Sequence, residues 1–161
     1  MLNATIHIEH KGLYVFVLFA SMILTILALG PGIFGAVDPV ASIHSIQHQI
    51  FNMVCHQDPL RSFSVNGGYM AVCSRCIGIY AGFTIIWLGM PWIARMFKLE
   101  NVPFLQLFIG AIMLNLVDVF GNLIQFWTNT DGSRFIFGII FGVSTALLLI
   151  NEFFKQKMIE D

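Results

Sequence analysis

All three cysteines of the chain fall between residues 55 and 76, together with one of its five histidines. Cys55 directly precedes His56, and Cys73 and Cys76 form a C-x2-C pair. Three thiolates and one imidazole make up a tetrahedral ligand set that suits zinc, because zinc binds soft sulfur and imidazole ligands well. The stretch between Cys55 and Cys73 is loop-sized, so the two motifs can meet. The sequence therefore predicts a zinc site formed by Cys55, His56, Cys73 and Cys76.

The C-x2-C pair also permits redox chemistry. Cys73 and Cys76 can close a disulfide, and a helix N-terminus together with Arg75 would favour a thiolate there. Membrane helices with such a pair at one mouth resemble the disulfide-generating quinone oxidoreductases and the vitamin K epoxide reductases, which relay electrons through further cysteine pairs. This chain has only one further cysteine, Cys55, so it lacks the second cysteine pair that a complete relay needs. The alternative to a metal site is therefore a thiol–disulfide oxidoreductase with a quinone as cofactor. In a third interpretation, the three thiols have no chemical role and pack as small apolar side chains.

A second group of polar side chains lies in otherwise apolar sequence. Asp118 falls in the middle of a long apolar run, where a carboxylate is costly and usually faces a partner inside the protein. Three amides extend it into one polar stripe at helical spacing: Asn115, Asn122 and Gln125. The stripe is either a structural seam between helices or the path of a small transporter for an ion, a proton or an anionic ligand. The candidate polar or ligand-binding residues are Arg61, Arg75, Asp118 and Arg134.

Long apolar segments must position these residues. The chain is 57% hydrophobic and 11% charged, whereas a soluble domain carries about 25% charged residues. A membrane helix needs about 20 mostly apolar residues. Four segments meet this requirement: 13–36, 69–94, 102–127 and 134–154. The sequence therefore predicts an all-α four-helix transmembrane bundle that forms a single domain over residues 1–161.

The segment between the first two predicted spans is too polar to cross a membrane. Its apolar residues recur at helical spacing, which predicts an amphipathic helix over residues 39–57 on the membrane interface. Asp38 and Pro39 suit its start, and Pro59 marks its end. His44 and His48 within it are four residues apart and could share a metal ion, although two histidines facing lipid headgroups are the preferred interpretation.

Basic residues predict the orientation of the chain. Five of them fall on one side of the membrane if the chain crosses four times: Lys11, Arg95, Lys98, Lys155 and Lys157. That side should be cytoplasmic, so both termini are expected in the cytoplasm and the cysteines on the outer face of the cell (inner or plasma) membrane. The net charge of −1 gives no reason to expect a nucleic-acid partner.

Four glycines form small-xxx-small patterns on the second and fourth predicted spans. They are Gly78, Gly82, Gly138 and Gly142. Such patterns let helices approach closely, either within one chain or between copies. A homo-oligomer that uses these glycine faces is therefore one expectation.

Taken in order, several motifs resemble one family. CHQDPLRSF, then CSRCIGIYAG, then an aspartate in a later span and finally R-x3-G-x3-G resemble a family of small prokaryotic membrane proteins catalogued as domain of unknown function 2085. The resemblance covers about residues 51–142. The matching residues are Cys55, His56, Gln57, Arg61, Ser62, Phe63, Cys73, Arg75, Gly78, Tyr80, Gly82, Asp118, Arg134, Gly138 and Gly142. It implies an integral membrane protein and no particular activity, because the family is named for lacking one.

Overall fold

A computed structural model describes residues 4–34, 41–65, 68–96 and 102–158. It has four helices that are long and apolar enough to cross a membrane, which confirms the predicted all-α transmembrane fold. These helices are α1 (Lys11–Phe34), α3 (Ser74–Met96), α4 (Phe104–Leu123) and α5 (Asp131–Leu148). The last candidate span continues from α5 through the short helix α6 (Ile150–Phe153).

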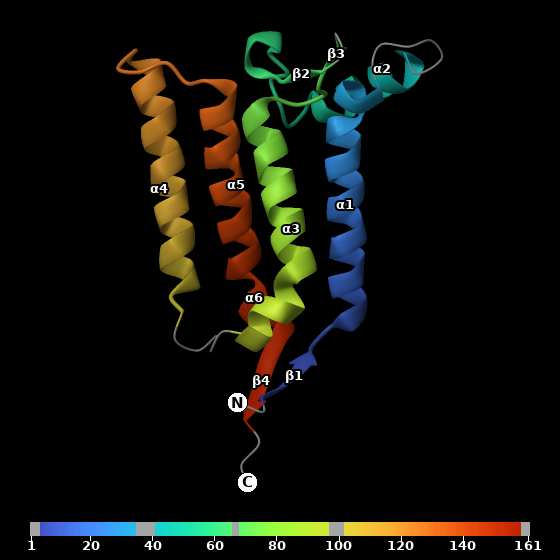
Figure 1. Cartoon of the computed structure of the whole chain (residues 1–161), viewed down its shortest axis with the longest axis vertical. Helices are drawn as coiled ribbons and strands as arrows, with labels where there is room; N and C mark the ends of the chain where they lie inside the picture. The colour runs from blue at the N-terminus through green and yellow to red at the C-terminus, as the bar shows by residue number, and fades with distance from the viewer. Residues whose placement is uncertain (1–3, 35–40, 66–67, 97–101, 159–161) are drawn as a thin grey trace.

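The four long helices stand side by side in the order α1, α3, α5 and α4 (Figure 1). The two central helices, α3 and α5, make the most extensive contact. Glycines allow this close approach: a methyl group added at Gly82 would lie 2.7 Å from the carbonyl oxygen of Ile139. Gly78, Gly138 and Gly142 face backbone atoms of the partner helix in the same way. The glycine faces therefore pack against each other within one chain, and a homo-oligomer stays a prediction.

The outer helices of the row are attached by polar contacts as well as apolar ones. On α1, the Tyr14 hydroxyl donates a hydrogen bond to the Trp87 carbonyl (2.8 Å), and the Trp87 indole N–H donates to the Tyr14 carbonyl (3.1 Å). On α4, the Asn115 amide donates to the Phe137 carbonyl of α5 (3.2 Å). These contacts lie inside the membrane-spanning part, where water is scarce and unpaired polar groups are costly.

A small sheet joins the two ends of the chain. Strand β1 (Ala4–Ile8) pairs antiparallel with β4 (Phe154–Met158), with Ile6 opposite Gln156. The sequence did not predict this pairing. Both strands lie at the same end of the helix row (Figure 1), as four crossings require.

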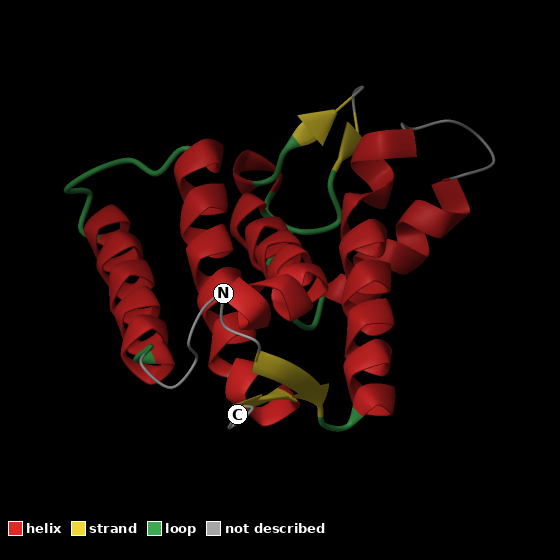
Figure 2. Cartoon of the chain, turned by 60° about the horizontal axis from the view of Figure 1, so that its bottom comes forward, coloured by secondary structure: helices red, strands yellow, loops and turns green. Residues whose placement is uncertain are grey.

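The opposite end carries Cys55, Cys73 and Cys76, and we call it the cysteine end. Helix α2 (Ala41–Phe51), the 3-10 helix η1 (Pro59–Arg61) and a hairpin of β2 (Ser64–Val65) and β3 (Gly68–Tyr69) build it. Figure 2 shows this hairpin and the terminal sheet at opposite ends of the helices. All three cysteines are thus brought to one end by elements that do not themselves span a membrane, together with the first turn of α3.

Helix ends differ from the predicted ones where turns interrupt an apolar run. The interfacial helix predicted over 39–57 ends at Phe51, and residues 39–40 lie outside the described part of the chain. The span predicted from residue 69 begins at Ser74, because residues 68–69 belong to the hairpin.

The third span ends at Leu123 rather than residue 127, because Gln125 takes a left-handed conformation (φ 58°). Gln125 therefore leaves the polar stripe and is exposed. Helix α5 begins three residues before the predicted position, where the Thr130 side chain accepts a hydrogen bond from the Ser133 N–H and caps the helix.

Candidate metal centre

Three cysteine side chains converge at the cysteine end. Cys55 comes from the segment after α2, Cys73 directly precedes α3, and Cys76 lies in its first turn. Their sulfur atoms all lie within 4.8 Å of one another. Cys55 is buried, whereas Cys73 and Cys76 are half-buried. The structure thus brings together three of the four predicted zinc ligands.

Hydrogen bonds fix the loop that carries Cys55. Gln57 has a left-handed backbone (φ 52°), so the chain turns sharply after Cys55. Its side-chain amide donates to the carbonyl oxygens of His48 (2.8 Å) and Ala71 (2.9 Å), which ties the end of α2 to the segment before α3. As a result Cys55 faces Cys73, whose N–H donates to the Cys55 sulfur (3.1 Å). Sequence reasoning did not assign this positioning role to Gln57.

Apolar side chains surround the three sulfur atoms. Ala28 of α1, Phe51 of α2 and Ile77 of α3 are all buried in one cluster with Cys55. Cys73, Cys76 and Tyr80 pack against this cluster, and the rings of Phe51 and Tyr80 lie 6.0 Å apart. The thiols are therefore packed among apolar side chains, with Cys55 buried and the other two half-buried.

His56 lies outside the group of converging ligand atoms. The group comprises Cys55, Cys73 and Cys76, and the His56 side chain is exposed. Its neighbour Cys55 points into the protein, so the two adjacent residues face different surroundings. His48 is half-buried, and the side chain of His44 lies outside the described part of the chain.

The electrostatics of the site favour a thiolate at Cys55. Hydrogen bonds from the Cys73 side chain and from the Cys76 side chain hold the pKa of the Cys55 thiol well below its ordinary value, and the Cys73 N–H adds to them. These hydrogen bonds outweigh burial, which alone would raise the pKa. A thiolate is the form of cysteine that acts as a metal ligand and as a nucleophile.

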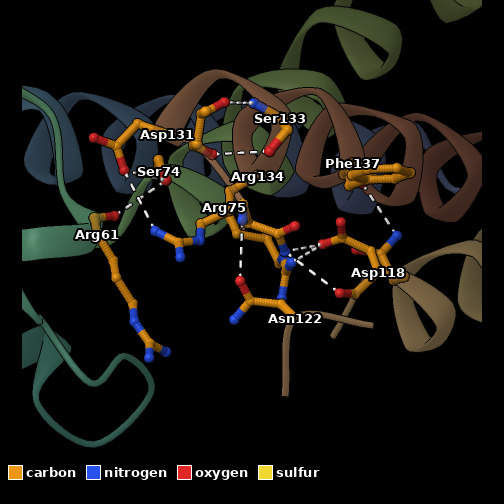
Figure 3. Close-up of polar contacts among 12 residues, drawn as sticks. Arg61, Ser74, Arg75, Asp118, Asn122, Asp131, Ser133, Arg134 and Phe137 are labelled. Carbon is orange, nitrogen blue, oxygen red and sulfur yellow. Dashed lines mark hydrogen bonds and ion pairs between the residues drawn. The ribbon is translucent and has the colours of Figure 1, made fainter. Parts of the chain in front are cut away.

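Beside the thiols, Arg75 forms an ion pair with Asp118 and so joins α3 to α4 (Figure 3). Asp118 is buried and also accepts a hydrogen bond from the side-chain amide of Asn129 (2.8 Å). The Asn129 N–H in turn donates to the Asn122 side chain (3.0 Å). Asp118 thus has the partner that its position predicted. The sequence did not predict Asn129 as a partner of Asp118, and its only signal for this role is the polar run before Asp131.

The other two predicted arginines do not reach Asp118. Arg134 lies near Asp131, with 3.6 Å between its Nη1 and the carboxylate oxygen, and Arg61 pairs with Asp58 at 3.1 Å. Figure 3 shows the Arg61 carbonyl facing Ser74 while its guanidinium points away. The buried Ser74 hydroxyl donates to that carbonyl (3.1 Å), so the backbone of Arg61 rather than its charge holds the loop on α3.

Comparisons with known proteins agree with the membrane-spanning fold. The model of a family described as predicted membrane proteins, domain of unknown function 2085 (DUF2085), matches residues 55–148, from Cys55 to the last residue of α5. The chain belongs to this family.

Two uncharacterized proteins are similar to the chain. One, from Methanocaldococcus jannaschii, is 34% identical over 68% of this chain and 69% of its own. The other, from Methanothermobacter thermautotrophicus, is 32% identical over 61% of this chain and 86% of its own. No solved structure matches the chain significantly. The family and its relatives thus establish a membrane protein and leave its activity open.

Proposed function

We propose that this protein is an integral membrane protein that binds one thiophilic metal ion, zinc in the first place, through the thiolates of Cys55, Cys73 and Cys76. The observation that carries the proposal is the convergence of three sulfur atoms within 4.8 Å. Zinc–sulfur bonds of about 2.3 Å at tetrahedral angles separate the sulfur atoms by about 3.8 Å. Small side-chain rotations therefore suffice to complete such a site.

The hydrogen-bonding pattern supports a ligand role for the thiols over simple apolar packing. An N–H donor aimed at sulfur, as from Cys73 to Cys55, stabilises negative charge there. Three thiols that only filled space would need no such donor. A metal ion at this point would join the segment after α2 to the first turn of α3, and thereby fix the whole cysteine end.

The fourth coordination position distinguishes two forms of the site. The described geometry supports three thiolates with an open position for water or an external ligand, because the His56 side chain is exposed. The sequence favours His56 as the fourth ligand. We propose the open form, in which His56→Ala retains the metal.

Elemental analysis of the purified protein tests this function. We expect about one zinc ion per chain, lost in Cys55→Ser, Cys73→Ser and Cys76→Ser because each removes a thiolate. His56→Ala is the matched neighbouring control and should keep the metal. Metal-free wild-type protein with a disulfide among the three cysteines would contradict metal binding. Loss of zinc from the His56→Ala variant would show that His56 is the fourth ligand, and would overturn the proposed open position.

A thiol–disulfide oxidoreductase is the second candidate. The positions of Cys73 and Cys76 favour it, since their sulfur atoms lie within 4.8 Å of each other and a C-x2-C pair can close a disulfide. In this reaction Cys73 and Cys76 form a disulfide, and their two electrons and two protons convert a quinone to a quinol. Undiminished quinone reduction by a Cys76→Ser variant, with a reduced dithiol as the electron source, would exclude this pair as the redox centre.

A further inference from the structure

A trough runs across one face of the helix row, and none of the three cysteines lines it. Its first part, of about 440 Å³, lies among α1, α3 and α5. Its second part, of about 290 Å³, lies among α3, α4 and α5. Both parts are lined by Ile79 and Phe141, so they adjoin at the middle of the row. Pockets of this size that are apolar with a few polar groups are typical of small-ligand sites.

The charged group of the trough lies in the part nearer α4, whereas the polar lining residues of the other part are the uncharged Ser21, Tyr80 and Thr145. Arg75 and Asn115 line the part nearer α4, whereas Phe16, Leu24 and Phe83 line the other. The Arg75 side chain is 23% exposed and that of Asp118 only 4%, and Arg75 lines the trough whereas Asp118 does not. Arg75 uses one terminal nitrogen for Asp118, and its Nε is buried without a hydrogen-bond partner among the described residues. The ion pair with Asp118 therefore does not use every N–H group of the guanidinium.

The trough extends from the membrane boundary toward the membrane interior, as a lipid does. Arg75 lies in the first turn of α3, at the cysteine end, where the membrane-spanning segment begins. Ile79 lies about 6 Å farther along the helix axis, toward the membrane interior. A polar head at Arg75 would thus lie near the membrane boundary, with its chain extending into the apolar part.

We propose that the trough binds one anionic single-chain amphiphile, with its oxyanion head at Arg75 and its hydrocarbon chain over Ile79 and Phe141 toward α1. The charge of Arg75 selects an anionic head, and the apolar lining selects the chain. A comparable hollow on the other face of α4 and α5 offers a control. It measures about 430 Å³, and none of its lining residues is charged.

Native mass spectrometry of the purified full chain in detergent tests the proposal. The probes are palmitoyl lysophosphatidylglycerol and palmitoyl lysophosphatidylcholine, which share a chain and differ in net charge. We expect the anionic probe to be retained roughly fivefold more strongly, as about 1 kcal/mol from one partly exposed charge contact implies. Equal retention of the two probes would overturn the proposal, and this comparison needs no variant to fold.

Two tryptophan variants locate the binding. Ala20→Trp fills the trough from the exposed side of α1 and should abolish the preference for the anionic probe. Gly110→Trp fills the control hollow, also from an exposed position, and should leave the preference unchanged. The reverse pattern would overturn the assignment to this trough. A dimer that excludes both probes would instead identify a second copy of the chain as the occupant, and would overturn the lipid proposal as well.

Discussion

At the scale of single residues, the molecule has two main polar features, the three converging cysteines and the ion pair between Arg75 and Asp118. C-x2-C and Cys-His are local motifs, so sequence alone indicated a shared site for Cys55, Cys73 and Cys76. Whether His56 turns toward them depends on the backbone after α2, where the left-handed Gln57 orients the loop. The ion pair of Asp118 was likewise predictable in kind, because a buried carboxylate needs a partner. The choice of Arg75 over Arg134 depends on how α3, α4 and α5 pack.

The Arg75–Asp118 pair gives a prediction at this scale. Arg75→Ala leaves a buried carboxylate without its charge partner, and we expect a loss of about 3–5 kcal/mol in the free energy of unfolding. The control is Arg61→Ala, which removes an exposed pair with Asp58 and should cost about 0–1 kcal/mol. Thermal or denaturant unfolding in detergent measures both. Equal losses would show that the Arg75–Asp118 pair is not the tie between α3 and α4 that we describe.

At the scale of helices and strands, hydropathy located the four spans but not their ends. The third span ends early because Phe126 and Trp127 fold back: their N–H groups donate to the Gly121 carbonyl (2.9 and 3.4 Å). These residues are apolar, so hydropathy counts them as membrane helix. The same limit applies before Ser74, where the hairpin of β2 and β3 replaces a predicted helical turn. Hydrogen-bonded turns decide these boundaries, and composition does not record them.

The packing of α3 against α5 gives a prediction at the element scale. Gly142→Ala places a methyl group against the Ile79 carbonyl, and we expect a loss of about 1–3 kcal/mol through overpacking. Gly89→Ala is the same change on α3, at a glycine with nothing within 4 Å of the added methyl group. Because alanine favours helix, that control should gain up to about 1 kcal/mol. Unfolding in detergent measures the change in the free energy of unfolding for both variants. A change of the same sign in both would show that the glycines do not set the spacing between α3 and α5.

At the scale of the whole molecule, the sequence predicted four spans but not their arrangement. An apolar residue facing lipid and one facing another helix look alike in composition, so hydropathy cannot distinguish a closed bundle from the observed row. The row leaves both faces open, and one of them carries the proposed amphiphile trough. The terminal sheet was also beyond prediction, because its two strands come from opposite ends of the chain.

The orientation of the molecule remains a prediction, and it belongs to this scale. Lys11 at the start of α1 and Arg95 near the end of α3 lie toward the terminal sheet, which should therefore be cytoplasmic. Alkaline phosphatase folds only in an oxidising compartment. Inserted in the hairpin between β2 and β3 it should be active in cells, and fused to the C-terminus it should be inactive. If only the C-terminal fusion showed alkaline phosphatase activity, the cysteines would lie in the cytoplasm.

X-ray absorption at the zinc edge of the wild-type protein tests the central claim most directly. It reports the number and type of atoms bound to the metal, independently of any variant. We predict three sulfur neighbours at about 2.3 Å and one lighter oxygen or nitrogen neighbour at about 2.0 Å. A protein without zinc, or zinc with no sulfur neighbour, would contradict a metal centre formed by Cys55, Cys73 and Cys76.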